Sequence, residues 1–262
     1  MHPEQVTVGI GDGYRLPVVG LGTWNVTGAY VAPAVRTAIE CGYRHIDTAY
    51  GYGNEAEIGQ ALRDSGLDRA EVFLTSKIPP RRIGHEEETL AGSLRQLRTD
   101  YLDLWLIHAP PDTDEQSARL WEFVIGARER GRVRAIGVSN YSTGQIDQLA
   151  AVTGVMPAVN QIRWSPALFD PERIAQMRER SIALEGFSAI RLTNLDDPRL
   201  VAVAAAHGVT PAQVLVRWQL QHEIVALPRS VRAERIRENF AVWDFELTPD
   251  ELALIDGLST VT

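Results

Sequence analysis

Three residues whose side chains could do chemistry, Asp47, Lys77 and His108, each stand near the end of a strand-like stretch. They follow one another at intervals of about 30 residues, the length of a strand plus a helix, which predicts parallel neighbouring strands. The carboxyl ends of such strands meet at one edge, where α/β barrels carry their chemistry. Three unrelated polar residues that close strands are the alternative, but a charged pair and a histidine at one edge favour a functional site.

A tyrosine, Tyr52, follows Asp47 in a glycine-punctuated loop. The local sequence reads Gly42-Tyr43-Arg44-His45-Ile46-Asp47-Thr48-Ala49, then Tyr52-Gly53-Asn54-Glu55. It resembles the first signature of the aldo-keto reductases, and the resemblance runs over essentially the whole chain. Within that family the chain is similar to bacterial NADPH-dependent 2,5-diketo-D-gluconate reductases. The family's tetrad of Asp, Tyr, Lys and His matches Asp47, Tyr52, Lys77 and His108.

The resemblance implies an oxidoreductase acting on CH–OH groups, which reduces an aldehyde or ketone with NADPH. Carbonyl reduction needs an acid for the forming alkoxide, and the pKa of free tyrosine, about 10, is high for that role. A neighbouring ammonium lowers the pKa of a phenol by stabilising the phenolate. We therefore expect Tyr52 to donate the proton, with Lys77 lowering its pKa and Asp47 holding Lys77. His108 would hydrogen-bond the carbonyl and orient it. Taken alone, Tyr52 could equally be an aromatic that packs at the rim.

The sequence does not support a doubly wound dinucleotide fold as the cofactor site, because no Gly-x-Gly-x-x-Gly follows a strand. The resemblance instead implies NADPH lying extended across the barrel mouth. Ser139, Asn140 and Gln161 match the residues that hold the carboxamide, and Phe187, followed by Ser188, matches the aromatic that stacks on the nicotinamide. Without the family, Ser139 and Asn140 would more often cap the next helix.

The last strand–helix unit resembles the family's adenosine-phosphate site. Arg229 replaces the more usual lysine, and Ser230 and Arg235 match positions that hold the 2′-phosphate. A helix N-terminus with two guanidiniums suits a phosphate. Glu238 and Asn239 match the adenine contacts. The alternative is an arginine-rich solvated helix, and Arg232 and Arg237 could be only that.

Two stretches depart from the family pattern. On the sixth expected barrel strand the chain reads Asn160-Gln161-Ile162-Arg163-Trp164-Ser165-Pro166, where relatives have Asn-Gln-x-Glu-Tyr-His-Pro. After the seventh, Phe187-Ser188-Ala189-Ile190 replaces Tyr-Ser-Pro-Leu. The tail beyond the last helix is short. Trp24, Tyr50 and Trp164 are expected to form an aromatic-walled substrate pocket, open on one side. Such an apolar pocket discriminates weakly between similar substrates.

The order of strands and helices predicts one domain over residues 1–262, a (β/α)8 TIM barrel with a short C-terminal tail. A β-hairpin over residues 5–18, around Gly11-Asp12-Gly13, is expected to cap its bottom, as in the family. The expected barrel strands cover residues 18–23, 44 onward, 72–78, 102–109, 133–139, 157–163, 181–188 and 223–228. The expected helices cover 32–42, 54–66, 85–98, 114–130, 143–152, 171–180, 210–221, 232–238 and 248–257.

The 262-residue chain has a globular composition, with 45% hydrophobic residues. Its formal net charge of −8 disfavours nucleic acid or an anionic membrane as a partner. The single cysteine, Cys41, is compatible with a reducing compartment. We see no signal peptide, no apolar run of about 18 residues and no metal-ligand spacing among the histidines. We expect a cytoplasmic monomer that acts on a small-molecule carbonyl substrate.

Two other functions fit the same barrel. Lys77 could form a Schiff base with its substrate, as in aldolases, but such an enzyme would not need Gln161 or the arginines of the last strand–helix unit. Alternatively the chain could be a non-catalytic barrel of the same family that senses a nucleotide. An intact tetrad argues against a purely structural role.

Overall fold

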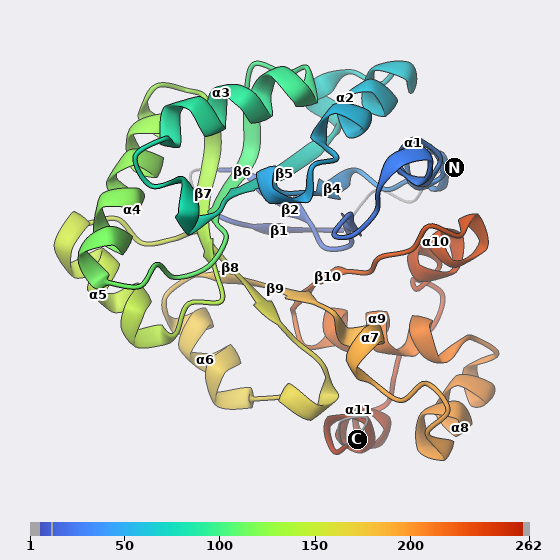
Figure 1. The fold of residues 1–262 in the computed structure, drawn as a ribbon. Helices are drawn as coiled ribbons and strands as arrows, with labels where there is room; N and C mark the ends of the chain where they lie inside the picture. Colours follow the sequence, from blue (N-terminus) through green and yellow to red (C-terminus); the bar gives the residue numbers. More distant parts are fainter. Residues whose placement is uncertain (1–5, 12, 259–262) are drawn as a thin grey trace.

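The computed structural model describes residues 6–258 other than Asp12. Within these residues eight parallel strands form one sheet in the order β3 to β10 (Figure 1). The sheet closes on itself through a parallel bridge between Val19 and Ala226, where the Gly20 amide donates to the Ala226 carbonyl at 2.9 Å. The predicted TIM barrel is therefore confirmed. The strands are β3 (Leu21–Gly22), β4 (His45–Asp47), β5 (Phe73–Ile78), β6 (Leu102–Ile107), β7 (Val133–Ser139), β8 (Val159–Arg163), β9 (Ala183–Phe187) and β10 (Val225–Leu227).

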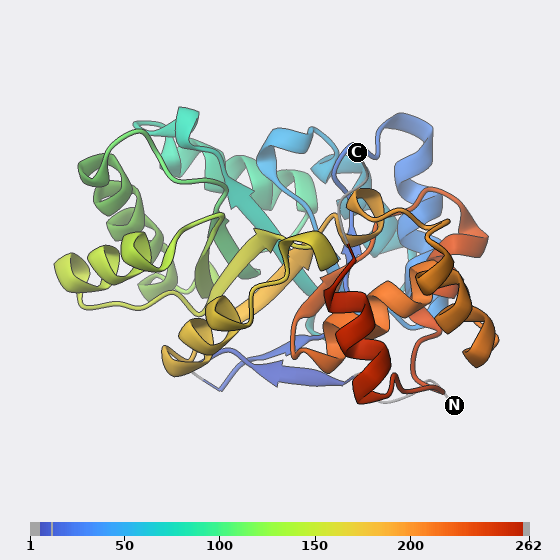
Figure 2. The same ribbon diagram turned by 90° about the horizontal axis from the view of Figure 1, so that it is seen from below.

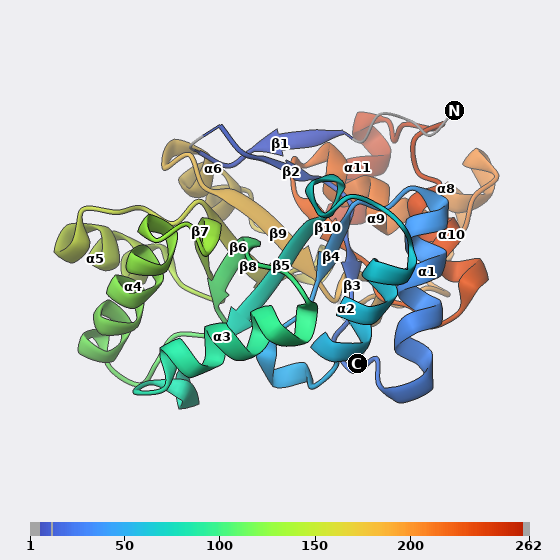
Figure 3. The ribbon, with the colours of Figure 1, turned by 90° about the horizontal axis from the view of Figure 1, so that it is seen from above.

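Helices surround the strands and cover the outside of the barrel (Figures 1 and 3). Their ends follow from local sequence: α9 starts at a capping box in which Thr210 and Gln213 satisfy each other's backbone N–H, with Pro211 at the first position. The helices are α1 (Val31–Cys41), α2 (Glu55–Asp64), α3 (Glu86–Leu97), α4 (Asp114–Glu129), α5 (Thr143–Thr153), α6 (Pro171–Glu179), α7 (Ala189–Leu192), α8 (Pro198–His207), α9 (Pro211–Gln221), α10 (Ala233–Phe240) and α11 (Pro249–Asp256).

The antiparallel hairpin of β1 (Thr7–Gly9) and β2 (Arg15–Pro17) lies across one end of the barrel (Figures 2 and 3). Its Ile10 and Leu16 are buried and pack in one cluster with residues that begin strands, such as Phe73 and Val159. The hairpin therefore seals the amino-terminal end with apolar side chains, as predicted, and leaves the carboxyl-terminal end open. Asp12, at the predicted turn, lies outside the described residues.

Side chains along each strand point alternately out towards the helices and into the barrel, which are two different environments. Outward-facing residues such as Leu74, Trp105 and Ile136 join the main core beneath the helices. Inward-facing positions are apolar near the hairpin, but towards the open end they become polar, as in the step from Phe73 to Lys77. A polar group of side chains is thus held inside the barrel at its mouth.

Two helices depart from the sequence expectation: α7 and α8 both lie between β9 and α9, where no helix was predicted. The longer of the two is α8, with ten residues. Its signals are in the sequence: the Asp197 side chain caps the helix, Pro198 occupies its first turn, and Gly208 ends it with a left-handed backbone, φ 66°. The first barrel strand is also shorter than predicted, because regular pairing with β4 covers only Leu21–Gly22.

Within the described part of the chain no single helix is long and apolar enough to cross a membrane. Helices α8 and α9 meet the length and composition test only when taken together, as a pair bent by 86°.

Candidate active site

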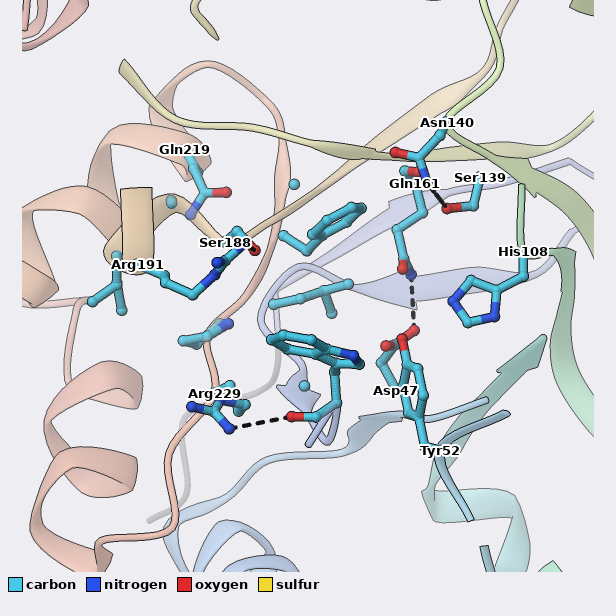
Figure 4. Close-up of a pocket in the computed structure, with 18 of the residues that line it drawn as sticks. Asp47, Tyr52, His108, Ser139, Asn140, Gln161, Ser188, Arg191, Gln219 and Arg229 are labelled. Carbon is cyan, nitrogen blue, oxygen red and sulfur yellow. Dashed lines mark hydrogen bonds between the residues drawn. The ribbon is translucent and has the colours of Figure 1, made fainter. Parts of the chain in front are cut away.

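A cavity of about 380 Å³ opens at the carboxyl-terminal ends of the strands (Figure 4). Asp47, Tyr52 and His108 lie on one side of it, and Arg191 and Arg229 lie on the opposite side. Most of the residues predicted to act on substrate or cofactor border this space. They are Trp24, Asp47, Tyr52, His108, Ser139, Asn140, Gln161, Phe187, Ser188, Arg229 and Arg235.

Asp47 ends β4, and Lys77 lies on the neighbouring strand β5. The Lys77 ammonium is fully buried and donates to Asp47 Oδ1 at 2.7 Å, to Asp47 Oδ2 at 2.8 Å and to the Thr48 carbonyl at 2.8 Å. Burial lowers the pKa of Lys77, but the adjacent Asp47 carboxylate, with smaller contributions from other neighbours, outweighs burial and raises the pKa above its usual range. Lys77 is therefore a fixed positive charge beneath the cavity.

The Tyr52 ring lies over that charge, with its centroid 5.3 Å from Lys77 Nζ. The pKa of Tyr52 is nevertheless raised above 10, because burial disfavours the phenolate more than Lys77 stabilises it. The expected lowering by Lys77 exists as one contribution, but the net direction is opposite to the prediction. Tyr52 is thus held as a protonated phenol.

The loop that carries Tyr52 is tied to the rest of the mouth by Asn54. Its side-chain amide donates to the carbonyls of Thr23 and Val26, both at 2.9 Å, and its oxygen accepts from the Thr48 hydroxyl at 2.8 Å. Asn54 is 1% exposed, so these bonds are shielded from water. They explain why a short glycine-containing loop places Tyr52 reproducibly above Lys77.

His108 follows β6, and its ring meets the Tyr52 ring edge-on, with centroids 5.5 Å apart. Burial, reinforced by the charge of Lys77, lowers the pKa of His108 to about 4. The imidazole is therefore neutral near pH 7. A neutral imidazole can donate one hydrogen bond to a carbonyl without competing with Tyr52 as an acid.

The polar residues predicted for the carboxamide lie together on β7 and β8. Ser139 Oγ donates to the backbone carbonyl of Gln161 at 2.8 Å and accepts from Asn140 Nδ2 at 3.0 Å. Asn140 and Ser188 have left-handed backbones, φ 61° and 69°, which are uncommon for residues other than glycine and turn the chain at the rim. Phe187 ends β9 and borders the same space.

The arginine side of the cavity is exposed, and no acidic residue of the described ranges borders it there. Arg229 donates to the carbonyls of Trp24 and Asn25, both at 3.3 Å, and Arg235 has no hydrogen bond or ion pair with any described residue. Ser230 is buried, and its Oγ accepts the Arg232 amide at 3.1 Å, which orders the start of α10. Asn239 is buried on α10, Glu238 beside it is half-buried, and neither borders the cavity.

Two of the three predicted substrate-pocket aromatics are elsewhere. Trp164 is 1% exposed and stacks on Trp218 of α9, with ring centroids 6.4 Å apart, so it belongs to the core. The Arg82 guanidinium lies over the Tyr50 ring, 5.4 Å from its centroid, and Tyr50 does not border the cavity. Trp24 does border it and is 49% exposed. Of the three predicted aromatics, Trp24 alone borders the described cavity.

Two ionisable residues of the site were not singled out from the sequence. Arg191 borders the cavity with its guanidinium 5.6 Å from the Trp24 ring centroid. It lies in the short helix α7 that follows β9, and in the fold both Arg191 and Arg229 contact the Trp24 ring, although they are far apart in sequence. Glu185 lies inside the barrel two residues before Phe187, and strand alternation places both on one face.

The described residues contain no group of three or more His, Cys, Asp or Glu side chains that could hold a metal ion.

Comparison with known proteins points to one family. The model of the aldo/keto reductase family matches residues 18–260. An aldo-keto reductase of Mycolicibacterium vanbaalenii is 40% identical over 259 residues, 98% of this chain and 93% of that protein. An aldo/keto reductase from Brucella melitensis superposes with a TM-score of 0.92 at 36% identity, covering 96% of this chain and 98% of that one. A Bombyx mori aldo-keto reductase in complex with NADP superposes with a TM-score of 0.89 at 31% identity, covering 96% and 92%.

Proposed function

Because the chain belongs to the aldo/keto reductase family, we propose that it reduces an aldehyde or ketone to the alcohol with NADPH, and that Tyr52 donates the proton. The observation that carries this proposal is the buried Lys77–Asp47 pair under the Tyr52 ring, with neutral His108 beside it and a cavity above. A protonated phenol, a fixed cation and a neutral hydrogen-bond donor are the groups that carbonyl reduction requires.

The cavity suits a nicotinamide dinucleotide phosphate. At one end Ser139, Asn140 and Gln161 offer polar atoms to a carboxamide, and Phe187 offers an aromatic face. At the other end, beside the start of α10, the guanidiniums of Arg229 and Arg235 have no acidic partner in the part of the chain that the structure describes. Guanidiniums bind phosphate oxygens with paired donors, and helix starts favour anions. The Bombyx mori relative, solved in complex with NADP, supports the same cofactor class here.

When bound, NADPH supplies the hydride, and the chain's own residues do the rest. His108 donates a hydrogen bond to the substrate carbonyl and orients it towards Tyr52. As negative charge develops on that oxygen, the Tyr52 hydroxyl gives up its proton, and the Lys77 ammonium stabilises the resulting phenolate. Asp47 keeps Lys77 in place and balances its charge. The raised pKa of Tyr52 ensures that the donor is protonated at the start.

The geometry disfavours a Schiff-base aldolase. A lysine nucleophile must lose its proton and reach a carbonyl, for which enzymes lower the pKa of the amine. All three N–H groups of Lys77 are engaged, its pKa is raised, and it does not border the cavity. A non-catalytic nucleotide sensor would use the arginine side alone, and nothing in the complete Asp47–Lys77–Tyr52 arrangement favours it.

The test is turnover. Purified protein is offered a panel of aldehydes, ketones and sugar-derived carbonyls with NADPH, and loss of the reduced nicotinamide absorbance band is followed. Substrate-dependent loss of the band is the expected result. NADPH binding without turnover of any carbonyl in the panel would favour the sensor, and borohydride trapping of a substrate adduct on Lys77 would favour the aldolase.

A further inference from the structure

A second buried carboxyl lies inside the barrel, and the proposed reaction does not use it. Glu185 on β9 is 0% exposed, and its Oε2 accepts from Gln161 Nε2 at 2.9 Å. The same Nε2 donates to Asp47 Oδ2 at 2.8 Å, the bond drawn in Figure 4. One amide nitrogen on β8 therefore bridges two carboxyl groups from strands β4 and β9.

This bridge determines which way Gln161 faces. A side-chain amide has two N–H donors on nitrogen and an acceptor oxygen, and both donors of Gln161 are taken by carboxyl oxygens. Its Oε1 has no hydrogen-bond partner among the described residues, and Gln161 borders the cavity. The bond to Asp47 alone would let the amide turn about that contact, whereas the second bond, to Glu185, sets its plane. Gln161 thus offers an acceptor to a ligand.

Only one of the two carboxyl groups is balanced by a cation. The three N–H groups of Lys77 go to Asp47 and Thr48, so none reaches Glu185. His45 Nε2 lies 3.8 Å from Glu185 Oε1, but burial lowers the pKa of His45 to about 4, so its ring is neutral near pH 7. Two ionised carboxylates on one amide nitrogen would repel each other strongly. Burial, together with the charge of Asp47, raises the pKa of Glu185 to about 8, which leaves Asp47 as the anion.

We propose that Glu185 is a positioning residue. As an uncharged acid it holds the Gln161 side chain jointly with Asp47, so that Gln161 Oε1 accepts an N–H of the nicotinamide carboxamide. The identity of the ligand rests on the proposed function, whereas the uncharged state of Glu185 does not. The role is specific to an amide donor, because a ligand without that N–H gains nothing from a fixed acceptor.

Two substitutions separate this role from simple packing. Glu185→Gln keeps a neutral acceptor for Gln161, whereas Glu185→Leu keeps the bulk and removes it. Dissociation constants are measured by quenching of tryptophan fluorescence for NADPH and for its 3-acetylpyridine analogue, in which a methyl group replaces the amide nitrogen. One hydrogen bond is worth about 0.5–1.5 kcal/mol, so wild type should prefer NADPH up to about tenfold. Glu185→Gln should keep that preference, and Glu185→Leu should lose most of it.

Two outcomes would overturn the proposal. If Glu185→Leu weakened the binding of both dinucleotides equally, Glu185 would be only structural. If Glu185→Gln lost as much of the preference for NADPH as Glu185→Leu, an ionised carboxylate would be required.

A second measurement needs neither the leucine variant nor the cofactor. The infrared difference spectrum between wild type and Glu185→Gln near pH 6 should contain the C=O stretching band of a protonated carboxylic acid. Its absence would contradict the proposal, because Glu185 would then be ionised. If wild type binds no NADPH and reduces no carbonyl, the proposed function fails, yet this band still reports whether Glu185 is the uncharged acid.

Discussion

Beneath one side of the cavity the Lys77 ammonium is buried, and every N–H it has is engaged. At the other side Arg229 and Arg235 are exposed and lack an acidic partner among the described residues. The first arrangement is complete within the protein, so its geometry is set by folding. The second has an excess of positive charge at the cavity that an anionic ligand can neutralise. A residue removed from the first should therefore affect the chemistry and stability, and one removed from the second should affect binding.

The largest effect is expected from Lys77→Met. The phenolate of Tyr52 loses its stabilising cation, so turnover should fall by roughly 10²–10⁴-fold, the range typical of acid–base catalysis. Asp47 would also be left buried without its partner, at a cost of about 3–5 kcal/mol in unfolding free energy. Reductase rates and chemical denaturation measure the two effects.

The double variant Asp47→Asn/Lys77→Met is the matched control for the lysine change. It removes both charges, so much of the stability should return while turnover stays low. Recovery of turnover in the double variant would show that the cation is not needed for the chemistry.

An intermediate effect is expected from Arg235→Ala on the opposite side of the cavity. A charge-assisted hydrogen bond is worth about 1.5–3 kcal/mol, so the dissociation constant for NADPH should rise at least about tenfold. That for NADH, which lacks the 2′-phosphate, should hardly change. Fluorescence quenching measures both, and Arg232→Ala on the same exposed segment, away from the cavity, is the control. Equal losses for the two cofactors would show that Arg235 does not contact the phosphate.

A further effect concerns stability and its dependence on pH rather than activity. Burial raises the pKa of Glu185 from 4.5 to about 8, so between these values the folded chain keeps a proton that the unfolded chain has lost. The stability from this group is complete below pH 4.5 and is lost as the pH rises to about 8. Glu185→Gln has no such proton, so its stability relative to wild type should rise over this interval by on the order of a few kcal/mol.

Denaturant unfolding of both proteins at several pH values tests this expectation. The pKa values of His45 and His108 are lowered by burial, so their contribution is lost as the pH falls towards about 4. Both histidines are present in wild type and variant, so their effect cancels in the difference. A difference that stays constant with pH would mean that Glu185 is ionised in the folded protein.

The sequence was informative where chemistry depends on position along a strand. Asp47, Lys77 and His108 come at the ends of successive strands, so the strand–helix repeat was enough to bring them to one edge. The hairpin cap and most helices were also predictable, because capping residues and alternation are local signals.

Residues whose surroundings come from distant segments were not predictable in the same way. Trp164 follows β8, but it turns away from the cavity because Trp218 of α9 offers it a stacking partner. Tyr50 likewise packs its ring against the Arg82 guanidinium. Strand alternation could place Glu185 inside the barrel, but its charge depends on Asp47 and Lys77 from two other strands. Burial also raised the pKa of Tyr52, whereas the sequence predicted that Lys77 would lower it.

The most direct test of the account compares Tyr52→Phe with Tyr50→Phe, two losses of one hydroxyl from neighbouring positions. Carbonyl reduction is followed at the reduced nicotinamide absorbance band, with NADPH binding measured alongside. Tyr52→Phe should bind NADPH normally and lose roughly 10²–10⁴-fold in turnover. Tyr50→Phe should keep its activity, because Tyr50 lies outside the cavity. Near wild-type turnover by Tyr52→Phe would contradict the account, because Tyr52 would then not be the proton donor.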